Sequence, residues 1–519
     1  MEMNMLKLAP VFSNHMVLQR NKRIAFWGEC DKEAVTLTLN GVSVSEKVNN
    51  GTFYAELPPM KEGGPYTMTV SDGTETISFE DIMLGEVWLA GGQSNMELEL
   101  QNSFEGKEEL KRVCSEKIRY YYVPKYSFES EVFEQAQKDS TWECPSEETA
   151  GKWSAVAYYY AKELSKKLGV TVGIIGCNWG GTSASCWMSR EMLEQSKATA
   201  SYVEEYDRIV KDQIFEEYLK EREEYIAYQT EFEKNVSHYY ETCENPTWDE
   251  AISLFGENRY PGPMGPYSEF RPGGLYETML YRVCPYTLSG FLYYQGEEDD
   301  HKPATYYELL SALIRQWRGD WKDETLPFLL VQLPVFQNMD EPDYKNWPLI
   351  REAQMRVYQT IKNTGIAVIL ENGEYGNIHP TKKDIVGKRL ALQAFYSVYH
   401  VGKEEDAFGP IYHDYFVNAN QMTITFEHCD GFVCQGEVKG FELAGDDKTY
   451  YAADCTIEGD RIVLQAKEVG QPKYARYCWT NYQEIALFGT NGIPAAPFRT
   501  SFADGSVATG SRLTNEGVM

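Results

Sequence analysis

Four short segments contain the residue types that acyl transfer requires. Ser94 follows a glycine pair, Gly180 and Gly181 are adjacent, Gln295 ends an apolar run, and His379 precedes a proline. A serine hydroxyl becomes a nucleophile when a histidine takes its proton. Backbone N–H groups beside glycines, and a side-chain amide, can stabilise the oxyanion that then forms. Together these residue types indicate a serine-dependent reaction at a carbonyl carbon.

Ser94 and His379 are both predicted to lie at helix entries. A helix is predicted to begin near Met96, and its amino end would favour a hydroxyl that acts as a nucleophile. Taken alone, a Gly-Gly-x-Ser motif favours a serine that caps the helix. His379 precedes Pro380 and the capping-box pattern Thr381-x-x-Asp384, which predicts a rigid position for its ring. The combination of all four segments favours the nucleophile over the cap.

The strands that must position these residues are short apolar runs that alternate with helical stretches. The expected strands are Glu86–Ala90, Val170–Ile175, Gly290–Tyr294, Phe328–Leu333 and Ala367–Leu370. This alternation is typical of a doubly wound α/β sheet, in which ligands bind outside the carboxyl ends of the strands. Each of the four segments follows one of these strands. We therefore expect the four segments to meet at one edge of the sheet.

The sequence predicts three regions. Residues 1–80 contain short alternating runs separated by Asn-Gly and Asp-Gly, which predicts a β-sandwich-like accessory domain. Residues 81–404 form the expected catalytic domain, with an acidic helical insertion at about 196–250. Residues 405–519 return to short strands and form a β-rich region that is a candidate to pack with the N-terminal domain.

Composition excludes several classes of partner. The 519 residues include 49 Lys and Arg against 78 Asp and Glu, a formal net charge of −29. Such a charge repels nucleic acids and anionic membrane surfaces. No apolar run is long enough to span a bilayer, and the eleven cysteines contain no Cys-x-x-Cys pair. The chain as given predicts a cytoplasmic location, or export if a signal peptide has been removed.

The same segments, read together, resemble a known family. They are Gly92-Gln93-Ser94-Asn95-Met96, Trp179-Gly180-Gly181-Thr182, Tyr294-Gln295-Gly296-Glu297 and Ile378-His379-Pro380. This set resembles SGNH (GDSL) hydrolases of the sialate O-acetylesterase type. Further matching segments are Met16–Arg20, Leu326–Phe328, Arg351–Gln354 and Pro494–Arg499, so the resemblance extends over nearly the whole chain.

The resemblance implies a flavodoxin-like, three-layer α/β/α domain with a parallel sheet and β-rich accessory regions at both ends. It implies removal of O-acetyl groups from sialic acid or other acetylated glycans through an acetyl-enzyme intermediate. Ser94 would be the nucleophile and His379 the base. The oxyanion would be bound by Gly180, Gly181 and Gln295, and the substrate by Gln93, Asn95 and Glu297. No cofactor and no metal are expected, and the partner is a small-molecule or oligosaccharide substrate.

The acid that would orient His379 is not where such enzymes place it. The positions three and two residues before the histidine are Gly376 and Asn377 instead of an aspartate. Glu374 is the first candidate to replace that aspartate, and Glu371 is the second. The amide of Asn377 or a backbone carbonyl could also orient the ring, the latter leaving a Ser–His dyad.

An acidic run, Glu298-Asp299-Asp300-His301, follows the third segment. We expect it to shape the rim of the site and to disfavour anionic sialic acid, which favours neutral acetylated glycans. A metal site is the less favoured interpretation, because adjacent residues rarely converge on one ion. Two other functions stay open: a weakly catalytic glycan-binding protein with a degraded triad, and an SGNH esterase for other short-chain acyl esters.

Overall fold

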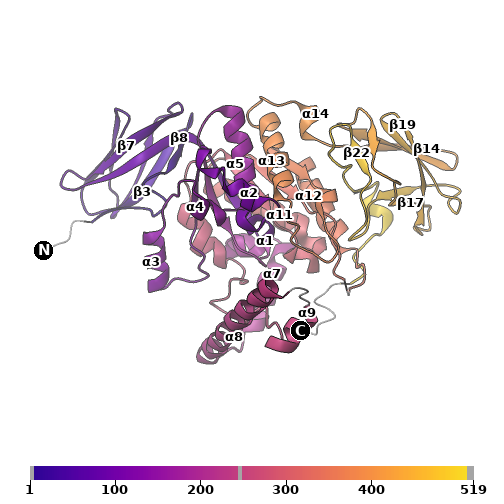
Figure 1. Cartoon of the computed structure of the whole chain (residues 1–519), viewed down its shortest axis with the longest axis horizontal. Coiled ribbons are helices and arrows are strands. Elements are labelled where there is room, and N and C mark those ends of the chain that lie inside the picture. The colour runs from indigo at the N-terminus through magenta and orange to yellow at the C-terminus, as the bar shows by residue number, and fades with distance from the viewer. Residues whose placement is uncertain (1–4, 244–247, 340, 511–519) are drawn as a thin grey trace.

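The computed structural model describes residues 5–243, 248–339 and 341–510. It is a mixed α/β fold with a central mixed sheet and a β-rich C-terminal region (Figure 1). The parallel part of the sheet has the order β9-β10-β8-β11-β12-β13. These strands are β8 (Thr76–Gly92), β9 (Ile118–Tyr122), β10 (Val172–Asn178), β11 (Gly290–Tyr294), β12 (Phe328–Gln332) and β13 (Thr364–Val368).

Helices cover both faces of these parallel strands. Trp88 of β8 packs edge-on against Tyr160 of α5 (Ala155–Leu168), at 5.2 Å between ring centroids. Gly91, three residues further along β8, belongs to the opposite face of the sheet, because successive residues of a strand alternate between the two faces. There the ring of Trp317 from α11 (Tyr306–Asp320) fills the space beside it. Helix α13 (Lys383–Ser397) packs with α5, and α12 (Asn346–Thr360) packs with α11.

The order of the parallel strands determines where the candidate site lies in the fold. Strand β8 has β10 on one side and β11 on the other, so the chain crosses over β8 between them. The loops that leave these strands diverge at such a switch point and open a crevice at their carboxyl ends. The segments after β8, β10 and β11 are three of the four segments singled out in the sequence analysis. They meet because their strands are neighbours in the sheet.

One of the two N-terminal sheets continues directly into the central sheet. One sheet contains β1 (Leu6–Leu8), β3 (Ile24–Cys30) and β6 (Thr52–Leu57). The other contains β4 (Ala34–Leu39), β5 (Val42–Lys47) and β7 (Gly63–Ser71), and β7 pairs with the first half of β8. The 17 residues of β8 therefore cross the expected boundary at residue 80 without a linker.

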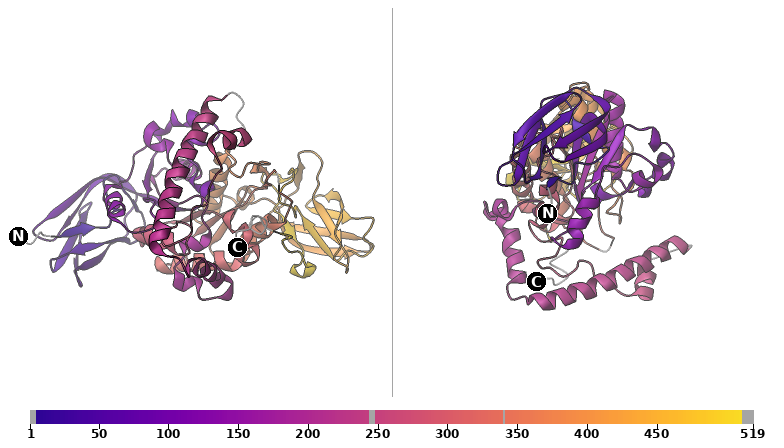
Figure 2. Two further views of the ribbon diagram at one scale, coloured as in Figure 1. Left: turned by 90° about the horizontal axis from the view of Figure 1, so that it is seen from below. Right: turned by 90° about the vertical axis from the view of Figure 1, so that its left-hand side faces the viewer.

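The C-terminal strands lie at the opposite end of the molecule from the N-terminal sheets (Figures 1 and 2). The expectation that the two β-rich regions pack together is therefore wrong. The strands are β14 (Ile411–Asn418), β15 (Gln421–Glu427), β16 (Phe432–Cys434), β17 (Phe441–Ala444), β18 (Tyr451–Ala452), β19 (Asp454–Glu458), β20 (Arg461–Gln465), β21 (Tyr474–Tyr477), β22 (Leu487–Gly489) and β23 (Phe498–Arg499). Buried Arg351 of α12 anchors this region by donating to the carbonyls of Cys478 and Thr480.

Helices interrupt the α/β pattern between β10 and β11. They are α7 (Lys197–Val210), α8 (Phe215–Thr242) and α9 (Trp248–Phe255). The 28-residue α8 extends away from the sheet, as Figure 2 shows. None of the helices in the described ranges combines the length and the apolar content that crossing a membrane requires. After α9 the chain returns to the body of the protein through Tyr260 and Phe270, which lie at the site considered next.

Candidate active site

Ser94 lies at a sharp turn where β8 ends and the short helix α1 (Ser94–Glu97) begins. The turn depends on Gly92, whose φ is +134°. A Cβ atom at this residue would lie 2.1 Å from the carbonyl oxygen of Tyr294 on β11. Only glycine allows both this φ and this approach of the two strands. The turn leaves the Ser94 side chain partly exposed at the carboxyl edge of the sheet.

His379 reaches Ser94 from the loop that follows β13. Its Nε2 atom lies 2.8 Å from Ser94 Oγ, although 285 residues separate the two in the chain. His379 is an exposed residue. A hydroxyl and an imidazole at hydrogen-bond distance have the geometry that proton removal from a serine requires.

The two candidate acids do not contact the His379 ring. Glu371 forms an ion pair with Arg389 of α13, at 2.5 Å. The Glu374 carboxylate accepts from Asn377 Nδ2 at 2.7 Å, and Asn377 Oδ1 accepts the backbone N–H of His379 at 3.0 Å. Within the described ranges, Ser94 is the one hydrogen-bond partner of the ring. Glu374 and Asn377 thus hold the backbone beside His379, and Glu371 faces elsewhere.

The surroundings of His379 lower its pKa. The main cause is partial desolvation, and the positive charge of Lys383 adds to it. The negative charge of Glu97 opposes both by favouring the protonated ring. A lowered pKa keeps the imidazole neutral near pH 7, and a neutral imidazole can accept a proton.

A buried network joins the serine turn to the histidine loop. Asn95 Nδ2 donates to Glu297 Oε1 at 2.6 Å and to the carbonyl of Ile378 at 2.9 Å, and Asn95 Oδ1 accepts from Lys383 Nζ. Burial raises the pKa of Glu297 to about 7 and lowers the pKa of Lys383 to about 7. Asn95, Glu297 and Lys383 are each at most 2% exposed. The expectation that Asn95 and Glu297 contact substrate is therefore not supported.

Gln93 and Gln295 are also turned inward. Gln93 Oε1 accepts the backbone N–H groups of Gly296 and Glu298, at 3.3 and 3.2 Å. The Gln295 amide donates to Asp299 at 2.6 Å and to the Thr182 carbonyl at 3.3 Å. Both amide hydrogens of Gln295 are thus engaged, so its expected donation to an oxyanion is not supported.

The acidic run after Gln295 does not form a rim. Asp299 is fully buried and accepts from Ser183 Oγ at 2.6 Å and from the Ala184 backbone N–H at 2.9 Å. Asp300 is also buried and accepts from Asn346 Nδ2 at 2.9 Å. The interpretation of an acidic rim is therefore wrong for these two residues, and the argument from it against anionic sugars no longer applies.

The described residues contain two clusters with metal-ligand geometry, and neither includes the acidic run. They are His15, Asp81 and Cys144, and Cys30, Asp31 and Asp72.

The two glycines after β10 lie beside Ser94. A Cβ atom at Gly180 would lie 3.3 Å from the Cβ of Ser94. The backbone N–H of Gly180 donates to the carboxylate of Glu97 at 2.6 Å, and Glu97 also pairs with Lys125. Gly181 has a φ of +69°, which favours glycine. Glu97, which the sequence analysis did not single out, thus fixes the position of this loop.

Two aromatic residues from the return of the helical insertion border the same loop. A Cβ atom at Gly181 would lie 1.8 Å from the Tyr260 hydroxyl and 3.3 Å from the Phe270 ring. The two rings pack edge to face, at 5.6 Å between centroids. The sequence analysis missed both residues. The one available signal was the Pro-Gly-Pro turn that follows Tyr260 and marks the return of the chain.

Comparisons with known proteins extend this description. A family model described as carbohydrate esterase, sialic acid-specific acetylesterase, matches residues 265–395. The sialate O-acetylesterases of Mus musculus and Homo sapiens are 24% and 25% identical to this chain. The alignments cover 95% of this chain and 94% of the mouse protein, and 96% of this chain and 93% of the human protein.

A solved structure is similar along the whole chain. It is a carbohydrate acetylesterase from Xanthomonas citri, with a TM-score of 0.75 and 26% sequence identity. The match covers 96% of this chain and 99% of that one. The resemblance to the sialate O-acetylesterase family indicated by the sequence motifs is therefore confirmed.

The two charges near His379 predict opposite shifts of its pKa. We expect Lys383→Met to raise the pKa of His379, because it removes a positive charge that opposes protonation. We expect Glu97→Gln to lower it, because it removes a negative charge that favours protonation. NMR titration of histidine-labelled protein measures both shifts without an activity assay. Equal pKa values in the two variants would contradict this account.

Proposed function

We propose that this protein is a carbohydrate O-acetylesterase that uses Ser94 as its nucleophile. The observation that carries the proposal is the 2.8 Å distance between Ser94 Oγ and His379 Nε2 at the carboxyl edge of the sheet. His379 takes the hydroxyl proton while Ser94 attacks the acetyl carbonyl. His379 then gives the proton to the departing sugar oxygen, which leaves an acetyl-enzyme. Water activated by His379 releases acetate in a second, equivalent step.

The oxyanion is assigned to backbone donors. The N–H groups of Ser94 and Gly181 belong to two loops that meet at the nucleophile. The neighbouring Gly180 N–H already donates to Glu97, which fixes the loop. Preorganised donors of this kind stabilise the negative charge of the tetrahedral intermediate without reorganisation. Gln295 has no part in this assignment.

The catalytic pair acts as a Ser–His dyad. Glu374 and Asn377 position the His379 backbone, and desolvation together with Lys383 keeps the ring neutral. The dyad belongs to a flavodoxin-like SGNH domain in which α5 and α13 form one helical layer and α11 and α12 form the other. The substrate class is O-acetylated carbohydrate, and Tyr260 and Phe270 contact the sugar that carries the acetyl group.

Replacement of the nucleophile is the first test. We expect Ser94→Ala to lower kcat for 4-nitrophenyl acetate and for acetylated sugars by about 10³-fold or more, because no covalent intermediate can form. His379→Ala should have a comparable effect. A series of 4-nitrophenyl esters of increasing chain length tests for preference for other acyl groups. Wild-type protein that binds glycans but hydrolyses none of these esters would instead support the glycan-binding alternative.

The dyad gives a second prediction. We expect Glu371→Gln, Glu374→Gln and Asn377→Ala each to lower kcat by less than about tenfold, since a direct orienting acid would be worth about 10⁴-fold. Acetate release at saturating substrate measures this effect, and circular dichroism checks that each variant is folded. A loss of 10³-fold or more in one variant would identify that residue as the third member of a triad.

The aromatic pair beside Gly181 gives a third prediction. We expect Tyr260→Ala to lower kcat/KM for an acetylated sugar by about tenfold, because a hydrogen bond and ring contact with the sugar are lost. Hydrolysis of 4-nitrophenyl acetate should change less, because that substrate carries no sugar. Equal losses on both substrates would show that Tyr260 supports the loop and does not contact sugar.

A further inference from the structure

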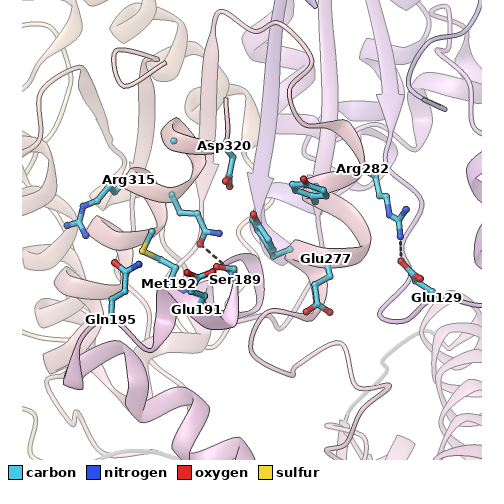
Figure 3. Close-up of a pocket in the computed structure, with 13 residues that line it drawn as sticks. Glu129, Ser189, Glu191, Met192, Gln195, Glu277, Arg282, Arg315 and Asp320 are labelled. Atoms are coloured by element: carbon cyan, nitrogen blue, oxygen red, sulfur yellow. Dashed lines mark hydrogen bonds and ion pairs between the residues drawn. The ribbon is translucent and has the colours of Figure 1, made fainter. Parts of the chain in front are cut away.

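One cavity of the structure is lined by residues that do not include Ser94. It has a volume of about 800 Å³ and is bordered by the end of α11, by the π-turn η4 (Tyr276–Leu280) and by residues 189–195 (Figure 3). Helix α11 ends at Asp320, shortly before β12 begins, so the cavity lies at the amino edge of the parallel strands. Ser94 lies at the carboxyl edge. The cavity is therefore separate from the candidate active site.

A second cavity, of about 680 Å³, adjoins the first. Both are lined by Tyr281, Arg282, Gly319 and Asp320. The far wall of the second cavity belongs to the N-terminal sheets, through residues of β3 and β6. The two cavities together form a groove that runs from the N-terminal sheets to η4, called here the interdomain groove.

Aromatic rings line the interdomain groove along its length. Tyr281 is 59% exposed and Tyr54 is 42% exposed, which are large fractions for side chains of this size. Trp27 and Tyr276 also line the groove and are partly exposed. The rings of Tyr276 and Tyr281 lie 6.0 Å apart. Exposed rings in a concave wall suit a ligand with flat apolar faces, and the C–H faces of sugar rings are of this kind.

The groove also holds buried polar atoms without partners. Asp320 Oδ2 and Arg282 Nε are buried and have no hydrogen-bond partner among the described residues. Figure 3 shows the Asp320 carboxylate directed into the cavity, and Arg282 paired with Glu129 beyond it. A buried polar group without a partner is costly, and a ligand hydroxyl can both donate to a carboxylate and accept from a guanidinium. Burial raises the pKa of Asp320 to about 6, and a hydrogen bond with the Tyr276 side chain opposes this shift.

The charges of the groove disfavour anionic ligands. Its acidic residues are Glu29, Glu129, Glu134, Glu191, Glu277 and Asp320, and its basic residues are Lys7, Arg282, Arg315 and Lys322. This acidic excess adds to the strongly negative charge of the whole chain. Phosphorylated or sulfated ligands would be repelled.

We propose that the interdomain groove is a second glycan-binding site, which takes a neutral oligosaccharide segment. Tyr54 and Tyr281 stack on sugar rings, and Asp320 and Arg282 bind sugar hydroxyls. The choice of a glycan over other neutral ligands rests on the proposed function. A polymer held in this groove would be retained while acetylated sugars along it reach Ser94 at the other edge of the sheet.

The test measures glycan binding by full-length Ser94→Ala protein, so that nothing is hydrolysed. Isothermal titration calorimetry with neutral hexasaccharides of glucose, xylose, mannose and N-acetylglucosamine should reveal binding of at least one of them. Adding Tyr54→Ala and Tyr281→Ala together should weaken that binding by about tenfold or more. Tyr451→Ala, an exposed tyrosine on β18, is the matched control and should leave binding unchanged.

Two outcomes overturn the proposal: no hexasaccharide binds, or binding is undiminished in the protein that lacks Tyr54 and Tyr281. Hydrolysis of 4-nitrophenyl acetate by protein with Ser94 intact and both tyrosines replaced shows that the replacements leave the fold sound. The same assay on the wild-type chain reports the proposed function separately. Activity without glycan binding would thus reject the groove alone.

Discussion

Asn95 is the residue on which the arrangement of the site depends. It follows Ser94 directly, yet its side chain is buried and donates a hydrogen bond to the carbonyl of Ile378, the residue before His379. Lys383 and Glu297 complete its hydrogen bonds on either side. Removing one partner from a buried charged set of this kind costs about 3–5 kcal/mol, because the remaining groups stay desolvated. Buried groups thus hold the loops that carry the Ser94 hydroxyl and the His379 imidazole in place.

Lys383 of this network and the partly exposed Glu97 determine the electrostatics around His379. Lys383 supplies a positive charge beneath the imidazole, and Glu97 supplies a negative charge beside it. Desolvation and Lys383 both favour the neutral form of the His379 ring, which is the form that can accept a proton. An orienting acid is not the only means by which a fold can prepare a histidine for this task.

The sequence was informative about where the chemistry lies and less so about which way side chains point. Ser94 and His379 could be paired in advance because strand ends of a parallel sheet meet at one edge. The direction of the Gln295 amide could not be predicted in this way, because Asp299, four residues later, accepts a hydrogen bond from it. The sequence predicts Asp299 and Asp300 to be surface acids because unpaired charges are rarely buried, whereas in the structure their donors come from distant segments. Nor does a β-rich pattern tell which part of the molecule it will pack against, so the expectation that the C-terminal region packs with the N-terminal domain is wrong.

The continuity of β8 sets a limit on how this protein could be divided. One unbroken strand pairs with β7 of the N-terminal region in its first half and ends two residues before Ser94. A chain cut after β7 would leave the first half of β8 without its neighbour and expose an unpaired strand edge, a known route to aggregation. Although the N-terminal part of the protein looks like an accessory module, it cannot be removed or exchanged as an independent unit. Shorter versions of this protein would have to begin within a strand that the catalytic domain needs whole.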